Sequence, residues 1–362
     1  MQTWTNLTLS EEQEMIVETA RKLADDALAP HAEAADECAR FPRDAFEAMG
    51  ELGFLGLPIS EESGGVGMGQ LAFCLALEEL AKACGATALS LAAHTGRCAR
   101  LIDFFGSAAQ REALVEPLTA GEHIGASSLD PSGVVESDGR LTGRAALVTN
   151  AEVASTLVVA ATSGETVRVF VVSKDAAGLA VEPPASTLGM RASGWADVVL
   201  DNVEAGDSLG DDGAVVVAAG LACARTAVAA IALGLAQGAF ERALCYSGER
   251  ATFGKVLAKH QAVAFKLAEC ATRIATARQQ VYHAARLADA GGDHARDAAI
   301  AKVVASECAT HCADEAIQIH GGYGYVGEYH VERIYRDAKH TEADAGSNHA
   351  CREFIGASFL GE

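Results

Sequence analysis

The segment "HGGYGY", residues 320–325, combines glycines and tyrosines in a way that could serve a bound ligand. Glycine has no Cβ, so a glycine-rich backbone can approach a phosphate-bearing cofactor closely. The alternative is purely structural, because glycine also ends helices and forms turns. This segment taken alone leaves both interpretations open.

Carboxylates follow further along the chain, in "KHTEADAGSN", residues 339–348. Taking a proton from carbon requires a base, and a carboxylate in apolar surroundings acquires a raised pKa that suits this task near neutral pH. Glu342 and Asp344 are the carboxylates that could take a proton if this segment is a chemical site. The structural alternative is that Asp344 or Ser347 caps the helix predicted for "NHACREFIGASF".

A metal site is a further possibility at Cys308 and Cys312, which lie four residues apart with His311 between them. Zinc needs additional ligands at suitable spacing, and the sequence offers none. The ten cysteines are scattered and form no CxxC pair. We therefore expect no metal, and we expect buried free thiols in a reducing cytoplasm.

Three successive blocks must position these residues. In residues 1–118 apolar side chains recur at helical spacing, starting after Ser10, which forms a predicted capping box with Gln13. Residues 119–210 hold short β-branched runs bounded by turns, such as "TVRVFVVSKD", and predict antiparallel strands. The helical period returns over residues 211–362. The predicted fold class is mainly α with a central antiparallel β-domain.

Composition excludes several classes of function. Lysine and arginine number 28 against 49 aspartates and glutamates, for a net charge of −21. An acidic surface disfavours nucleic acid and anionic membranes as partners. We expect no secretory signal in "MQTWTNLTLSEEQEMI" and no membrane span, since Arg225 interrupts the most apolar stretch. The expected location is the cytoplasm.

The chain resembles the acyl-CoA dehydrogenases over nearly its whole length. Five segments in the family's order carry the resemblance: "FPRDAFEAMGELGFLGL", "ALEELAKA", "LGMRASGWADVVLDNV", "RATFGKVLAKHQAVAFKLA" and "QIHGGYGYVGEYHVERIYRDAK". The resemblance implies three domains, namely an N-terminal helical domain, a middle β-domain and a C-terminal four-helix bundle. It also implies FAD as cofactor and an acyl thioester, on CoA or on a carrier protein, as substrate.

The resemblance further implies which residues contact FAD. The matching positions are Thr149, Arg250, Thr252, Phe253, Gln261, Gln318, Gly321, Gly322 and Ser347. Arginine suits a diphosphate because its guanidinium carries both a positive charge and a fork of donors. In the family these contacts cross a subunit boundary, so a homodimer or homotetramer is expected. Beside "RATFG", the cofactor interpretation of "HGGYGY" is the favoured one.

The sequence departs from the family where the catalytic base belongs. The family places a glutamate before a Gly-Thr or Gly-Ser pair, and here Ala345 stands in that position. Some members place it instead before an arginine of the bundle, and here Ala224 precedes Arg225. Asp344 and Glu342 remain as the carboxylates near the first position. His94, often histidine in the family, is expected to be structural.

The flavin end also departs from the family. The segment "SSLDP" lacks the threonine of the family's Thr-Glu-Pro, and the loop after it is shorter. Leu147 stands where a tryptophan is usual, although Thr149 and Asn150 are kept. We expect a FAD-dependent acyl-thioester dehydrogenase. The alternatives are a partner subunit without a base in a hetero-oligomer, and a non-dehydrogenase enzyme on the same fold.

Overall fold

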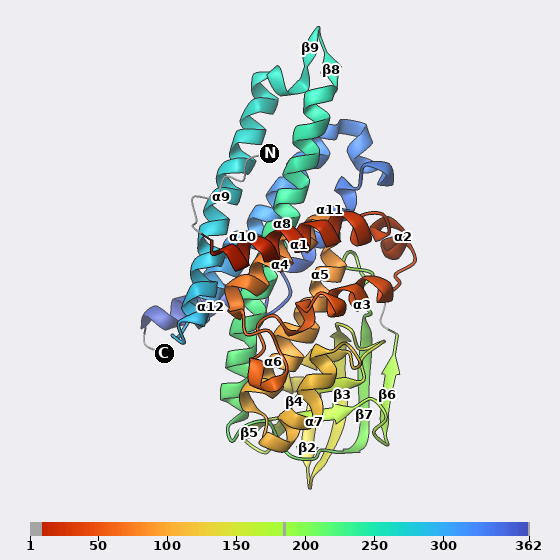
Figure 1. Ribbon diagram of the computed structural model, residues 1–362, viewed down its shortest axis with the longest axis vertical. Coiled ribbons are helices and arrows are strands. Elements are labelled where there is room, and N and C mark those ends of the chain that lie inside the picture. The colour runs from red at the N-terminus through yellow and green to blue at the C-terminus, as the bar shows by residue number, and fades with distance from the viewer. Residues whose placement is uncertain (1–8, 184–185, 361–362) are drawn as a thin grey trace.

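The computed structural model describes residues 9–183 and 186–360 and has three layers along its long axis (Figure 1). A helical bundle occupies one end, a β-sheet the other, and the N-terminal helices pack against both. The prediction of a mainly α fold around a central sheet is confirmed. The division at residues 118/119 and 210/211 stays a prediction; the last N-terminal helix ends at Thr119 and the bundle's first helix begins at Gly213.

The N-terminal block is helical, as the apolar spacing predicts. Ser10 caps the first helix, and Gln13 returns a hydrogen bond to Ser10, so the predicted capping box is confirmed. A π-helical segment, η4, interrupts the buried helices and places an extra residue in one turn, a feature common near functional sites. The elements are α1 (Glu11–Leu23), η1 (Ala24–Leu28), α2 (Ala32–Glu37), α3 (Arg43–Glu51), α4 (Gly69–Ala83), α5 (Gly85–Leu91), η4 (Ala92–Ala99), α6 (Arg100–Phe105) and α7 (Ala108–Thr119).

The middle block is one seven-stranded sheet in the order β1-β4-β2-β3-β7-β6, with β5 on β4. The prediction of an antiparallel domain needs correction, because β1 and β2 both run parallel to β4. The parallel pairs arise because β4 inserts between β1 and β2, whereas β3, the strand that precedes it in the chain, pairs with β2 and β7. The strands are β1 (Gly125–Ser128), β2 (Val134–Ser137), β3 (Arg140–Val148), β4 (Thr156–Ser163), β5 (Thr166–Ser173), β6 (Leu179–Glu182) and β7 (Ala196–Glu204).

The C-terminal block contains three long helices and two shorter ones. They are α8 (Gly213–Glu249), α9 (Gln261–Asp289), α10 (Ala295–His320), α11 (Val331–Thr341) and α12 (Asn348–Leu360). A small hairpin, β8 (Ala251–Thr252) and β9 (Lys255–Val256), joins α8 to α9 at the end of the molecule farthest from the sheet (Figure 1).

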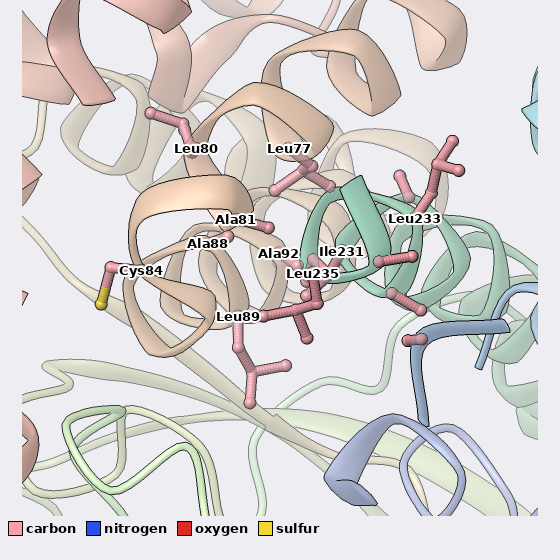
Figure 2. Packing of buried hydrophobic residues seen from close by; sticks show 14 of the residues in the cluster. Leu77, Leu80, Ala81, Cys84, Ala88, Leu89, Ala92, Ile231, Leu233 and Leu235 are labelled. Carbon is pink, nitrogen blue, oxygen red and sulfur yellow. The ribbon is translucent and has the colours of Figure 1, made fainter. Parts of the chain in front are cut away.

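The main core forms where α4, α5 and η4 meet α8. Leu77, Leu89, Ile231 and Leu235 interdigitate there (Figure 2). Gly234 makes the close approach possible, because a Cβ at this position would lie 2.3 Å from the carbonyl oxygen of Glu78. By length and composition α8 could cross a membrane, yet 67% of its most apolar window is buried within the protein. Its hydrophobic character therefore belongs to the core.

Candidate active site

His94 lies between the N-terminal helices and the sheet, and its contacts are structural. Its Nδ1 accepts a hydrogen bond from the N–H of Gly125 (2.9 Å), and its Nε2 lies 3.0 Å from the carbonyl oxygen of Leu118. These contacts select the neutral tautomer with its proton on Nε2. Burial disfavours the charged ring and lowers the pKa of His94 to about 4. With both nitrogens engaged, His94 has no free site for proton transfer.

Asp344 is largely buried, with 13% of its side chain exposed, and forms an ion pair with Arg97 of η4. The guanidinium nitrogens Nη1 and Nη2 each lie 3.3 Å from one carboxylate oxygen. The ring of His340 lies 3.7 Å from the same carboxylate, and the N–H of Ala345 donates to it at 2.7 Å. Burial alone would raise the pKa of Asp344, but Arg97 and His340 hold it well below its usual range. In this arrangement Asp344 is a stable anion and a weak proton acceptor.

Glu342, the other candidate base, faces helix α10. Its carboxylate accepts hydrogen bonds from the hydroxyl of Thr310 (2.6 Å) and the ammonium group of Lys339 (2.7 Å). Burial would raise the pKa of Glu342, but these two donors lower it below its usual value. Both oxygens therefore have partners on the bundle side of the loop.

Lys302 fixes the backbone of the loop that carries these carboxylates. It is fully buried, and its ammonium group donates to the carbonyls of Glu342 (2.8 Å) and Gly346 (2.9 Å) and to Oδ1 of Asn348 (2.8 Å). Burial opposes the charge and lowers the pKa of Lys302 to about 8. Since all three donors are used, Lys302 holds the connection between α11 and α12 in one conformation.

The two alanines that match the family's catalytic glutamates lie together in space. Ala224 of α8 and Ala345 of the loop form one buried apolar cluster with Val228. The Nε of Arg225 donates to the carbonyl of Ala345 (3.2 Å), and its guanidinium lies 4.9 Å from the centre of the Phe354 ring. The fold thus brings Ala224 and Ala345 together in one small buried apolar cluster next to Asp344.

The predicted flavin residues follow strand β3. Thr149 is buried, and Nδ2 of Asn150 donates to the carbonyls of Ser90 (2.8 Å) and Gly125 (3.1 Å). Within the described chain, Oδ1 of Asn150 and Oγ of Ser127 are buried without a hydrogen-bond partner. They are two of ten such side-chain atoms among the described residues, and a polar ligand or water that reached them would satisfy both.

A second group of predicted cofactor residues lies on and beside the hairpin at the far end of the bundle. The side chains of Arg250 and Gln261 are exposed, and Thr252 contacts His260 (3.3 Å). Phe253 is 98% exposed and has a φ of +50°, in the left-handed region that is unfavourable for a bulky residue. Among the described residues, nothing covers this aromatic side chain.

The third group ends helix α10. Gln318 and Gly322 are exposed, and Gly321 ends the helix with a φ of +61° that favours glycine. His320 stacks on Tyr246 at a centroid distance of 4.3 Å and so ties this turn to the last turn of α8. The predicted segments around Arg250 and Gly321 are therefore brought together at one end of the bundle.

Ser347, the remaining predicted contact, caps helix α12. Its hydroxyl accepts a hydrogen bond from the N–H of Ala350 at 3.2 Å. Ser347 is therefore the residue that caps α12. Asp344 does not cap this helix, because its carboxylate pairs with Arg97.

Sequence reasoning missed Arg97 and Lys302. The available signal was a charged side chain inside an apolar helical run, as in "LAAHTGRCARLI".

The expectation of buried thiols holds for eight of the ten cysteines, whereas Cys38 and Cys245 are exposed. Cys308 and Cys312 are buried with their sulfurs 3.9 Å apart, and all ten cysteines are free. Over residues 9–183 and 186–360 no group of three or more histidine, cysteine or carboxylate side chains could hold a metal ion.

The site residues fit FAD. Unpaired buried polar atoms at the sheet suit a flavin ring, and an exposed arginine beside glycine turns suits a diphosphate. When bound, FAD would supply a hydride acceptor for oxidation of a carbon–carbon bond. The fold and this site define a flavin-dependent oxidoreductase of three domains.

Comparison with known proteins identifies the family. Residues 10–122 match the acyl-CoA dehydrogenase N-terminal domain, and residues 211–360 match the C-terminal domain. A probable acyl-CoA dehydrogenase of Bacillus subtilis is 37% identical over 98% of this chain and 100% of its own. The chain belongs to the acyl-CoA dehydrogenase family and is a flavin oxidoreductase of that type.

Solved structures agree with this assignment. Butyryl-CoA dehydrogenase from Megasphaera elsdenii superimposes with a TM-score of 0.94 at 32% identity, covering 98% of this chain and 100% of that one. A prolyl acyl carrier protein oxidase superimposes with a TM-score of 0.91 at 26% identity, also over 98% and 100%. Proteins similar to this chain thus include one named for CoA and one named for a carrier protein.

Proposed function

We propose that the protein binds FAD and oxidises an acyl thioester carried on CoA or on a carrier protein, in the cytoplasm. The observation that carries this proposal is the apolar cluster of Ala224, Val228 and Ala345, which lies beside the carboxylate of Asp344, one residue before the family's base position. Neither alanine has a side chain that could take a proton, so the nearby carboxylate is the group to test. The proposal includes both CoA and a carrier protein as the carrier of the acyl group, because similar proteins named for each share the fold.

Asp344 is our candidate for the base, since it directly precedes Ala345 and is the carboxylate nearest to it in sequence. As folded, however, its ion pair with Arg97 lowers its pKa and makes it a poor proton acceptor. Glu342 is the weaker candidate, because both of its oxygens bond to Lys339 and Thr310. Catalysis by Asp344 therefore requires the pair with Arg97 to open.

The test is exchange of the substrate's α-proton with deuterium oxide, which reports proton abstraction separately from flavin reduction. We expect wild type to be slow with simple straight-chain acyl-CoA, and Ala345→Glu to accelerate exchange by about 10²–10⁴-fold, the usual contribution of a positioned base. Ala224→Glu, at the second position, guards against a misfolded first variant. Rapid exchange in wild type that survives both Asp344→Asn and Glu342→Gln would rule out both candidate bases.

We also propose a homodimer or homotetramer in which one chain completes the cofactor site of its neighbour. The exposed Arg250 and the uncovered Phe253 support this arrangement, because a partner and its cofactor would shield both. Light scattering tests the assembly. A monomer that holds a full complement of flavin would contradict the proposal.

A second function is also supported: the chain could be a subunit without a catalytic base that partners a related chain in a hetero-oligomer. The locked state of Asp344 and the alanines at both base positions favour it. This function predicts that neither Ala345→Glu nor Ala224→Glu exchanges the α-proton, whereas flavin retention rises when a related subunit is added. Absorption spectra with and without that subunit separate the two functions. Conversion of the thioester without net reduction of the flavin would instead indicate non-dehydrogenase chemistry.

A further inference from the structure

A cavity of about 450 Å³ opens at the surface of the N-terminal block, and no residue of the site around Ala345 lines it. Its walls come from η1, α2, the first turn of α3 and the start of α5. Pockets that bind small molecules usually measure about 300–1,000 Å³. The buried residues of its lining, here called the floor, are Leu28, Ala32, Phe41, Ala45, Cys84 and Thr87. The floor is therefore mainly apolar, and the cavity can hold a small organic molecule.

Thr87 places one hydroxyl in this apolar floor. The residue is 1% exposed, and its Oγ1 forms no hydrogen bond with any residue of the described chain. Cys84 also belongs to the floor, and its side chain points away from α8 (Figure 2). Buried polar groups are normally paired, because an unpaired one has lost its hydrogen bonds to water. A ligand with a polar group at its inner end would supply the partner that Thr87 lacks.

The rim of the cavity carries charged residues of both signs, namely Asp26, Arg40, Arg43 and Asp44. All four are exposed, and none of them forms an ion pair or a side-chain hydrogen bond with another described residue. Pro42 is the N-cap of α3 and makes no side-chain cap, so the positive end of this helix adds to the attraction of the arginines for an anion. A simple acid or a simple amine would use half of this rim, whereas a zwitterion matches both halves.

We propose that this cavity binds a free aromatic α-amino acid, at a site that is separate from the thioester site and independent of the proposed function. The carboxylate pairs with the two arginines of the rim, and the ammonium group pairs with an aspartate. The ring packs against Phe41, because aromatic pairs are favourable beyond the area that they bury. A hydroxyl on the ring reaches Thr87, so L-tyrosine binds more tightly than L-phenylalanine.

Cys38 provides a readout of binding that does not depend on activity. Its thiol is exposed and lines the cavity, and Cys245 on α8 is the other exposed cysteine. Iodoacetamide alkylates both thiols of the purified protein, and peptide mass spectrometry follows each rate. We expect saturating L-phenylalanine to slow alkylation of Cys38 by about 5-fold or more and to leave the rate at Cys245 unchanged. The dependence of this protection on ligand concentration gives the Kd.

Two analogues with a single charge test the rim. The probe 3-phenylpropionate lacks the ammonium group and 2-phenylethylamine lacks the carboxylate, while both keep the ring of L-phenylalanine. We expect L-phenylalanine to bind about 10-fold or more tightly than either analogue. Arg43→Gln should weaken L-phenylalanine by a similar factor and leave 2-phenylethylamine unchanged. Arg140→Gln is the matched control, because Arg140 is equally an exposed arginine but lies on β3 and does not line the cavity.

Thr87 tests the inner end of the cavity. L-Tyrosine should bind about 5-fold more tightly than L-phenylalanine, and Thr87→Val, which keeps the shape of the side chain, should remove this difference. If Thr87→Val does not fold, Ala35→Phe fills the cavity from the half-buried face of α2 and should abolish protection of Cys38.

Three results would overturn this inference: no protection of Cys38 by either amino acid, equal protection of Cys38 and Cys245, or equal binding of L-phenylalanine and 3-phenylpropionate. None of them touches the proposed function, because thioester oxidation is measured separately.

Discussion

The far end of the bundle and the loop around Ala345 differ in whether their side chains have partners in their own chain. At the far end of the bundle, Arg250 and Phe253 lie exposed, without partners in the described chain that would explain their residue types. Around Ala345 most of the charged groups are buried and have partners in their own chain, among them Lys302, Arg225 and the Arg97–Asp344 pair. We therefore expect substitutions of the exposed residues to cost less stability than the loss of these buried contacts.

The largest expected effect on stability is at Lys302. Lys302→Met removes a buried ammonium group and leaves the carbonyls of Glu342 and Gly346 unpaired, so we expect the free energy of unfolding to fall by about 3 kcal/mol. Urea unfolding measures this fall in the free energy of unfolding. Lys266→Met is the control, because Lys266 pairs with Glu315 near the surface, where such pairs contribute about 0–1 kcal/mol. Equal stabilities for the two variants would show that the loop does not depend on its buried anchor.

His94 makes the free energy of unfolding depend on pH. Its folded pKa, about 4, lies below its ordinary value, so the unfolded chain binds the proton more readily and stability falls as pH drops from about 6.5 toward 4. This one group contributes a loss of about 3 kcal/mol over that window. His94→Gln should flatten the slope, while His349→Gln, an exposed position, should leave it unchanged. A slope identical in wild type and His94→Gln would contradict the assignment of a neutral, buried ring.

The exposed end is tested by Arg250. Arg250→Ala should weaken flavin retention by about 1.5–3 kcal/mol, as expected for a lost hydrogen bond to a charged group, with unfolding of the flavin-free chain unchanged. Fluorescence of released flavin during dialysis gives the affinity. Lys255→Ala on the same hairpin is a matched control, because it removes a charge from the next strand. Equal flavin loss from both variants would mean that general charge, rather than Arg250, holds the cofactor.

The smallest effect is expected at Ser347, where the buried loop meets solvent. Ser347→Ala removes the hydroxyl that caps α12 and should cost about 1 kcal/mol of unfolding free energy. Ser347→Asp keeps an acceptor at that position and should recover most of the loss. If Ser347→Ala lowers flavin retention without changing stability, then Ser347 serves the cofactor, as the family resemblance implies, in preference to the helix.

The sequence by itself determined the fold class and the position of most helices. Capping at Ser10, apolar spacing along the N-terminal block and β-branched runs in the middle block depend on neighbours within a few residues, so local pattern suffices. It did not determine the direction of β1 and β2 relative to β4, because strand pairing is set by contacts between distant segments. The family resemblance predicted Arg250 and Gly321 as cofactor contacts; both are exposed in the fold, and their role stays a prediction.

Only the tertiary structure decided the chemistry around Ala345. Arg97 and Asp344 are 247 residues apart in sequence, and nothing in either local pattern indicates that they pair. The sequence made Asp344 a candidate base, but the pKa that decides this role depends on burial and on the charge that packs against it. The meeting of Ala224 with Ala345 was likewise set by the packing of α8 against the loop after α11. Proton affinity is a property of surroundings, and those surroundings exist only once the chain has folded.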